Sequence, residues 1–179
     1  MTIEPFWVQV NESTLRQGDY LPGCLVPIPV FDPTNFGVNS EIKDVQIEVN
    51  EVDLIVLTQS CDLDNHKVTQ VVVCAIYPIS EFEENNELFK KKGKWNEVLR
   101  GRVEGLHLLA SPTNPDNNKE ALVVNFREIQ TLPYEYILKH ASNLNDRWRL
   151  KSPYLEHFSQ AFSRLFMRVG LPSTLPPFS

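Results

Sequence analysis

Glycine, cysteine and methionine are scarce in this sequence: its 179 residues include seven Gly, three Cys and two Met. There is no GxGxxG or GxxxxGK[ST] loop to cradle the phosphates of a nucleotide, and no GxSxG turn of the kind that carries a nucleophilic serine. Cys24, Cys61 and Cys74 form neither a CxxC pair nor an even set, so neither a zinc-binding pattern nor a disulfide framework is indicated. The sequence predicts no metal and no cofactor.

Long apolar runs are absent as well. The sequence has no basic start followed by an apolar segment and a small-residue cleavage site. No run approaches the roughly 18 apolar residues that a membrane helix needs. We therefore expect a reduced, cytoplasmic protein without membrane contacts.

Basic residues are in the minority: 17 Lys and Arg are set against 23 Asp and Glu, for a net charge of −6. Dedicated non-specific nucleic-acid binders are usually strongly basic, so this balance argues against that class. The charge is also unevenly distributed. Residues 1–66 contain 11 acidic and two basic residues, whereas residues 67–179 have a small excess of basic residues. We expect the acidic part to favour a cationic partner, with an affinity that falls as salt rises.

Apolar patterns predict several β-strands. Residues 45–49 alternate between apolar and polar side chains, and residues 52–57 follow after Asn50-Glu51, which is the spacing of a two-residue hairpin loop. Leu54–Leu57 is apolar at every position, as is typical of a strand buried on both faces. Further strands are indicated at residues 24–30, 68–77, 105–110 and 121–126.

Two regions predict helices instead. In residues 80–103 the acidic side chains precede the lysines, an order that suits a helix dipole, so we expect a helical insertion between strands. Later, Ser152 can cap a helix and Pro153 suits its first turn, while apolar residues recur every three or four positions up to Gly170. This pattern predicts an amphipathic C-terminal helix.

The predicted elements amount to a mainly β (α+β) protein. We expect a small antiparallel β-barrel domain over residues 1–151, containing the helical insertion. The helix over residues 152–170 is expected to pack on the barrel, because its aromatic face would otherwise be exposed to water. Residues 171–179, which are rich in proline, are expected to form an extended tail.

The segment LTQSCDLD, directly after the apolar strand, concentrates candidate catalytic side chains: Thr58, Ser60, Cys61 and Asp62. Such groups often lie where a rigid strand becomes a loop. A Cys61 nucleophile would need a base, and His66 is five residues further on, but the neighbouring carboxylates favour the neutral thiol over the thiolate. A metal site at this segment would lack a second pair of ligands.

Basic residues concentrate in the helical insertion. Lysines within residues 90–94 lie near Trp95, Arg100 and Arg102. Basic side chains interleaved with aromatic rings are typical of surfaces that bind single-stranded nucleic acid. The alternative is a solvated helix face paired with the acidic residues of the same insertion. Arg100 and Arg102 are therefore candidate binding residues.

Three short motifs together resemble a known family. They are Gly18-Asp19, Val56-Leu57-Thr58, and a later segment with Val123-Val124, Arg127 and Thr131-Leu132. Over residues 16–140 the chain resembles the PemK/MazF family of growth-inhibiting toxins. The resemblance implies an SH3-like barrel, cleavage of single-stranded RNA without a metal, and a role in a toxin–antitoxin system or bacterial defence. It also makes Asp19 and Arg127 candidate binding residues, and Thr58 or Ser60 the counterpart of the family's catalytic Thr or Ser.

The same family relies on an arginine in the loop after the first strand, which this sequence lacks. Between Gln17 and His66 the only basic residue is Lys43. RNA cleavage needs a group that stabilises negative charge developing at phosphorus, and this part of the chain offers carboxylates. We therefore predict a non-catalytic protein-interaction or regulatory module that binds a protein partner through acidic loops. The alternative is a PemK/MazF-type endoribonuclease whose basic groups come from Arg100, Arg102 or Arg127; a homodimer is left open.

Overall fold

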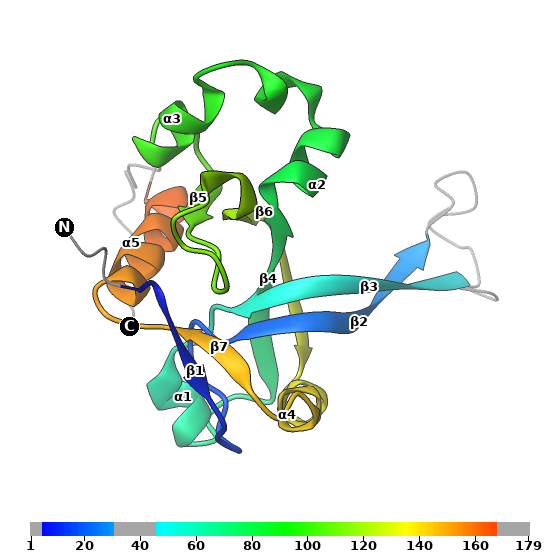
Figure 1. Cartoon of the computed structure of the whole chain (residues 1–179). Helices are drawn as coiled ribbons and strands as arrows, with labels where there is room; N and C mark the ends of the chain where they lie inside the picture. Colours follow the sequence, from blue (N-terminus) through cyan, green and yellow to red (C-terminus); the bar gives the residue numbers. More distant parts are fainter. Residues whose placement is uncertain (1–4, 31–45, 168–179) are drawn as a thin grey trace, which may run out of the picture.

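A computed structural model describes residues 5–30 and 46–167 of the chain (Figure 1). These residues form strands, α-helices and short 3₁₀ helices (η), in the following order: β1 (Trp7–Val10), β2 (Tyr20–Val30), β3 (Gln46–Val56), α1 (Ser60–Asp64), β4 (Gln70–Pro78), α2 (Ile79–Asn85), η2 (Glu87–Lys90), α3 (Lys94–Leu99), β5 (Leu106–Leu109), η3 (Asn118–Glu120), β6 (Leu122–Pro133), α4 (Tyr134–Asn143), β7 (Arg147–Leu150) and α5 (Tyr154–Phe166). The chain is thus an α+β protein. The tail predicted over residues 171–179 and the end of the terminal helix at Gly170 lie outside the described residues.

The strands form two antiparallel sheets. The larger sheet has the order β2-β3-β4-β6-β5, and β1 pairs with β7 in the smaller one. An isolated bridge between Asp19 and Arg149, and a hydrogen bond from Leu150 N to the Gly18 carbonyl at 3.0 Å, connect the two sheets. Gly18 has a φ of +82°, and a Cβ at this position would lie 2.9 Å from Leu155 Cδ1, so glycine is required here. Among the described residues no strand pairing closes the sheets into a barrel.

Strand β3 is continuous through the predicted hairpin loop, so that prediction is wrong. Asn50 and Glu51 lie within the strand and pair with Val26 and Leu25 of β2. Neither residue is glycine, and the tight hairpin turns need residues that adopt positive φ at low cost. The chain therefore remains extended across the whole of residues 46–56.

The centre of the large sheet is buried on both faces, as predicted from the apolar run Leu54–Leu57. These four residues are all 3% exposed or less. Leu54 and Val56 point into one core, which α4 covers with Ile137 and Ala141. Ile55 and Leu57 point into a second core on the opposite face, against which α5 packs. The two cores follow from the alternation of side chains along a strand.

Helix α5 begins at Tyr154, with Pro153 as its N-terminal cap residue and no side-chain capping bond. The prediction that Ser152 caps this helix is therefore wrong. Phe158 is completely buried in the second core, in contact distance of Phe126, whose ring centroid lies 5.6 Å away. The helical segment 80–103 contains α2, η2 and α3, where Phe82, Phe89 and Trp95 pack together. No helix in the described part of the chain is long and apolar enough to cross a membrane.

Candidate functional site

The predicted catalytic hydroxyls hold the end of β3 in place. Thr58 Oγ1 accepts a hydrogen bond from the backbone N–H of Val72 at 2.7 Å. Ser60 Oγ accepts one from the backbone N–H of Gln17 at 3.1 Å, and the Gln17 side-chain amide donates to the Leu57 carbonyl at 2.9 Å. Each hydroxyl oxygen is thus the hydrogen-bond acceptor for a backbone N–H group that has no partner within the sheet.

Cys61 and Asp62 lie on the short helix α1, next to these hydroxyls. The Cys61 thiol is exposed, and its contacts are with Gln59 Oε1 at 3.7 Å and Asp62 Oδ1 at 3.8 Å. Asp62 also pairs with Lys67 at 3.8 Å. The ring of His66 lies against Tyr134, with 5.6 Å between the centroids. Among the described residues, a carboxylate and not the His66 imidazole therefore lies beside the thiol. Across residues 5–30 and 46–167, no three His, Cys, Asp or Glu side chains come together as a metal site.

Asp19, a predicted binding residue, lies in the interior at the junction of the two sheets. Its side chain is completely buried and pairs with Arg147 at 3.0 Å and with Arg149. It also accepts a hydrogen bond from the backbone N–H of Arg16 at 3.0 Å. Both carboxylate oxygens are therefore engaged within the protein: Oδ1 accepts from Arg149, and Oδ2 accepts from Arg16, Arg147 and Arg149.

The three predicted binding arginines lie around the loop that precedes β5. Arg127 donates to the Glu104 carbonyl at 2.8 Å. Arg100 and Arg102 both pair with Glu97, at 3.6 Å and 3.2 Å, on the exposed surface. The candidate residues thus occupy separate regions: the turn after β3, the sheet junction, and this loop.

A feature that the sequence did not indicate is a two-stranded arm, formed by residues 25–30 of β2 and 46–51 of β3. Figure 1 shows these parts of the strands extending away from the rest of the molecule. The pairing puts Leu25, Pro27 and Pro29 on the same face as Val49 and Ile47. Leu25, Ile47 and Val49 are 53%, 61% and 59% exposed, so this face of the arm is mainly apolar and open to water, with Glu51 opposite Leu25 at one end.

The hydrogen bonding of Leu25 shows which backbone groups of the arm point outward. Its N–H donates to the Tyr136 hydroxyl at 2.8 Å, and its carbonyl accepts from the same hydroxyl at 2.9 Å. Leu25 therefore directs its polar backbone groups away from β3. Because these directions alternate, Pro27 and Pro29 also face outward and lose no bond to β3.

By the same alternation, the backbone N–H and carbonyl groups of Ile47, Val49 and Glu51 point away from β2. β3 pairs with β4 only through residues 54–56, so the edge of β3 along the arm has no neighbouring strand among the described residues. This edge contains no proline, unlike the β2 edge. It can accept an additional strand.

The arm is also acidic. β2 and β3 contain Glu48, Glu51 and Asp53 but no lysine or arginine. The Asp53 carboxylate bonds to the Tyr20 hydroxyl and accepts from the backbone N–H of Gly23 at 2.9 Å. Glu48 and Glu51 are exposed.

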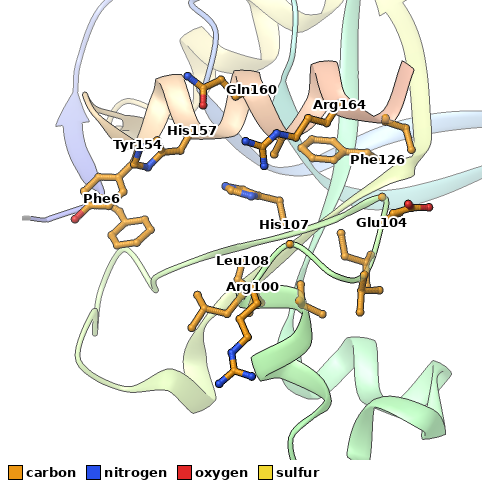
Figure 2. Close-up of a pocket in the computed structure, with 18 residues that line it drawn as sticks. Phe6, Arg100, Glu104, His107, Leu108, Phe126, Tyr154, His157, Gln160 and Arg164 are labelled. Atoms are coloured by element: carbon orange, nitrogen blue, oxygen red, sulfur yellow. The ribbon is translucent and has the colours of Figure 1, made fainter. Parts of the chain in front are cut away.

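A second feature missed from the sequence is a cleft of about 550 Å³ between α5 and the region of α3 and β5. Figure 2 shows the His107 ring, from β5, pointing toward α5, where His157 and Arg164 face the same space. Burial, and secondarily the charge of His157, lowers the pKa of His107 to about 4. Phe6 and Tyr154 stack at one end of the cleft, with ring centroids 3.6 Å apart. The sequence shows His107 and His157 only as single histidines in separate segments, so it does not indicate that they face the same cleft.

No protein-family model, no curated protein and no solved structure matches this chain. The assignment of a function therefore depends on the arm, the cleft and the strand-end residues described above.

Proposed function

We propose that this chain is a non-catalytic protein-interaction module, and that its acidic β2–β3 arm binds an extended, cationic segment of a partner protein. The observation that carries the proposal is the β3 edge of the arm, which combines outward backbone groups with exposed apolar and acidic side chains. A peptide that adds a strand to such an edge gains backbone hydrogen bonds, and its alternate side chains give specificity.

The chemistry of the partner follows from the side chains beside this edge. One face of the arm presents Ile47 and Val49, and the other presents Glu48. An added strand alternating between apolar and basic residues would match both faces, because side chains alternate between the faces of a sheet. A second copy of the chain would bring another acidic arm, so we favour a cationic partner over a homodimer.

The finer fold assignment, a PemK/MazF-like SH3-like barrel, is part of the same proposal. The Gly18-Asp19 turn continues the large sheet into the small one through the bridge to Arg149, which supports a curled arrangement of this kind. A cytoplasmic location is supported by Cys24 and Cys74, which are buried free thiols.

The alternative is an endoribonuclease of the PemK/MazF type, with Thr58 or Ser60 at its site. It has less support, because both hydroxyls accept backbone hydrogen bonds and Asp62 and Asp64 lie on the adjoining helix. Within residues 5–30 and 46–167, the basic side chains that form ion pairs at this turn are Arg16 and Lys67, and they pair with Asp64 and Asp62.

Binding of synthetic peptides to the full chain tests the proposal. The probes are a short peptide in which Val and Lys alternate, a peptide with the same composition in scrambled order, and one in which Val and Glu alternate. We expect isothermal titration calorimetry to detect saturable binding of the Val/Lys peptide alone, weakening as salt is raised. Equal binding of the scrambled peptide, or an affinity that is flat with salt, would contradict the proposal.

Variants of the arm locate the binding. Val49→Pro removes one outward N–H without removing a bond to β2 and should weaken the Val/Lys peptide about tenfold, whereas Val49→Thr keeps the N–H and should change little. The double variant Glu48→Gln/Glu51→Gln should reduce the affinity for the Val/Lys peptide about three- to tenfold. Glu135→Gln, which removes one exposed carboxylate from α4, is the matched control and should have no effect.

Incubation with single-stranded RNA in the absence of metal distinguishes the endoribonuclease from the interaction module. Cleavage that is lost in Thr58→Ala but kept in Thr58→Ser would favour the endoribonuclease and count against a non-catalytic module.

A further inference from the structure

The cleft beside α5 is a second candidate binding site, separate from the β2–β3 arm. We propose that it binds a small organic anion of nucleotide size, with the phosphate held by Arg164 and His157 and the planar ring placed against Phe6 and Tyr154. The volume of about 550 Å³ lies within the range of roughly 300–1,000 Å³ that is usual for small-molecule sites.

The charge of the lining favours an anion. Arg164 and Arg100 line the cleft together with His107 and His157, and the acidic residue in the lining is Glu104. In Figure 2 the Glu104 side chain points away from His107, toward the outside of the cleft. Figure 2 also shows the Arg100 guanidinium directed away from His107, so the nitrogen donors that face the space between β5 and α5 are those of His107, His157 and Arg164, in an otherwise largely apolar lining.

Arg164 is the group best placed to hold a phosphate. Figure 2 shows its guanidinium directed over His107 into the cleft. Within the described part of the chain it makes no ion pair and no hydrogen bond, whereas Arg100 pairs with Glu97 at 3.6 Å. An arginine that faces a concave site and has no partner among the described residues offers the planar donor geometry that binds phosphate oxygens in pairs.

The two imidazoles lie on either side of this space. His157 is exposed on α5 and can donate to an anion, while His107 lies among Phe126 and Phe158, with ring centroids 6.2 Å and 6.1 Å away. The low pKa of His107 leaves its ring neutral near neutral pH, so it can both donate and accept one hydrogen bond. A neutral imidazole in an apolar wall suits a hydroxyl or ring nitrogen of the ligand better than its phosphate.

The aromatic end of the cleft selects for a planar group. Phe6 and Tyr154 stack with an interplanar angle of 13°, and both line the cleft. Stacking of a base on aromatic side chains is tolerant of the base identity. An inorganic anion would leave this end unused, so the site fits a phosphate that carries an aromatic ring.

The test is titration of the full chain with adenosine 5′-monophosphate, adenosine and inorganic phosphate, followed by calorimetry and by the NMR signals of the histidine rings. We expect adenosine 5′-monophosphate to bind more tightly than either fragment and to shift the signals of both His107 and His157. Arg164→Ala should reduce its affinity about tenfold or more, and Arg164→Lys by less. Lys139→Ala, on α4, removes the same charge elsewhere and should leave the affinity unchanged.

Two results would overturn the inference: no saturable binding of adenosine 5′-monophosphate, or an affinity that Arg164→Ala changes no more than Lys139→Ala does. Circular dichroism of each variant confirms that the fold is kept. Binding of the Val/Lys peptide to the arm should be the same in wild type and Arg164→Ala, so failure at the cleft is distinct from failure at the arm.

Discussion

The Arg147 guanidinium donates through Nε to Oδ2 of Asp19 at 3.0 Å, and the two side chains are 1% and 0% exposed. This pair joins residues 128 positions apart and connects the small sheet to the large one. Arg147 also donates to the carbonyls of Glu12 and Thr14, which fixes the segment between β1 and β2.

Removal of the Asp19 carboxylate should be strongly destabilising. Asp19→Ala leaves the buried Arg147 without its counter-ion, and breaking such a pair typically costs about 3–5 kcal/mol. Urea denaturation measures the loss of unfolding free energy. Asp64→Ala breaks the exposed pair with Arg16 and should cost no more than about 1 kcal/mol. Similar losses of unfolding free energy in both variants would mean that the buried pair contributes no more to stability than the exposed pair.

The hydroxyl of Thr58 should contribute to stability. Thr58→Ala deprives the Val72 N–H of its side-chain acceptor, at a cost of about 1–2 kcal/mol, whereas Thr58→Ser keeps the acceptor oxygen and should recover most of this. Urea denaturation of the three proteins gives the comparison. If Thr58→Ala is as stable as wild type, the hydrogen bond to Val72 does not hold the strand end.

His107 should make the protein less stable in mild acid. Burial lowers its folded-state pKa to about 4, below the ordinary value of about 6.5, so as the pH falls between these values the unfolded chain gains a proton that the folded chain does not. The contribution of His107 to the free energy of unfolding should fall by about 2 kcal/mol between about pH 7 and about pH 5.

The check is denaturation of wild type and His107→Phe at both pH values. Carboxylates affect both proteins alike, so the variant should lose less stability on acidification than wild type. Equal losses would be incompatible with a depressed pKa, as would an NMR titration midpoint of the His107 ring near its ordinary value.

Two phenylalanines of α5 should differ sharply when truncated. Phe158 is fully buried between the sheet and the helix, so Phe158→Ala should cost about 3–5 kcal/mol. Phe166 is 63% exposed, and Phe166→Ala should change the free energy of unfolding by less than about 1 kcal/mol. Thermal or urea denaturation measures both. A small loss in Phe158→Ala would mean that the packing of α5 adds little to the core.

One of the three thiols should react readily in the folded protein. Cys61 is exposed, whereas Cys24 and Cys74 are buried, and burial raises the pKa of Cys24 to about 12 and also raises that of Cys74. A thiol reagent such as 5,5′-dithiobis(2-nitrobenzoate) should modify Cys61 quickly and the other two after unfolding. Cys61→Ser should abolish the fast phase; a fast phase that persists would contradict the burial of the other two.

The sequence by itself determined the elements that depend on local pattern. The unbroken apolar run Leu54–Leu57 indicated a strand buried on both faces, and the spacing of apolar residues after Pro153 indicated the helix that became α5. These predictions succeeded because side-chain periodicity is set by the backbone geometry of each element. Capping was less predictable, since Ser152 fits the pattern of a cap residue without occupying that position.

Only the tertiary structure decided which groups the polar residues contact. It brings Arg147 and Arg149 to the buried carboxylate of Asp19. It also places the backbone N–H groups of Val72 and Gln17 within hydrogen-bond distance of the Thr58 and Ser60 hydroxyls. The acidic character of the first part of the chain could be counted in advance. The open backbone edge along β3 could not be predicted in the same way, because it depends on how β3 pairs with β2. Strand register is set by contacts between residues far apart in the sequence, which no local pattern encodes.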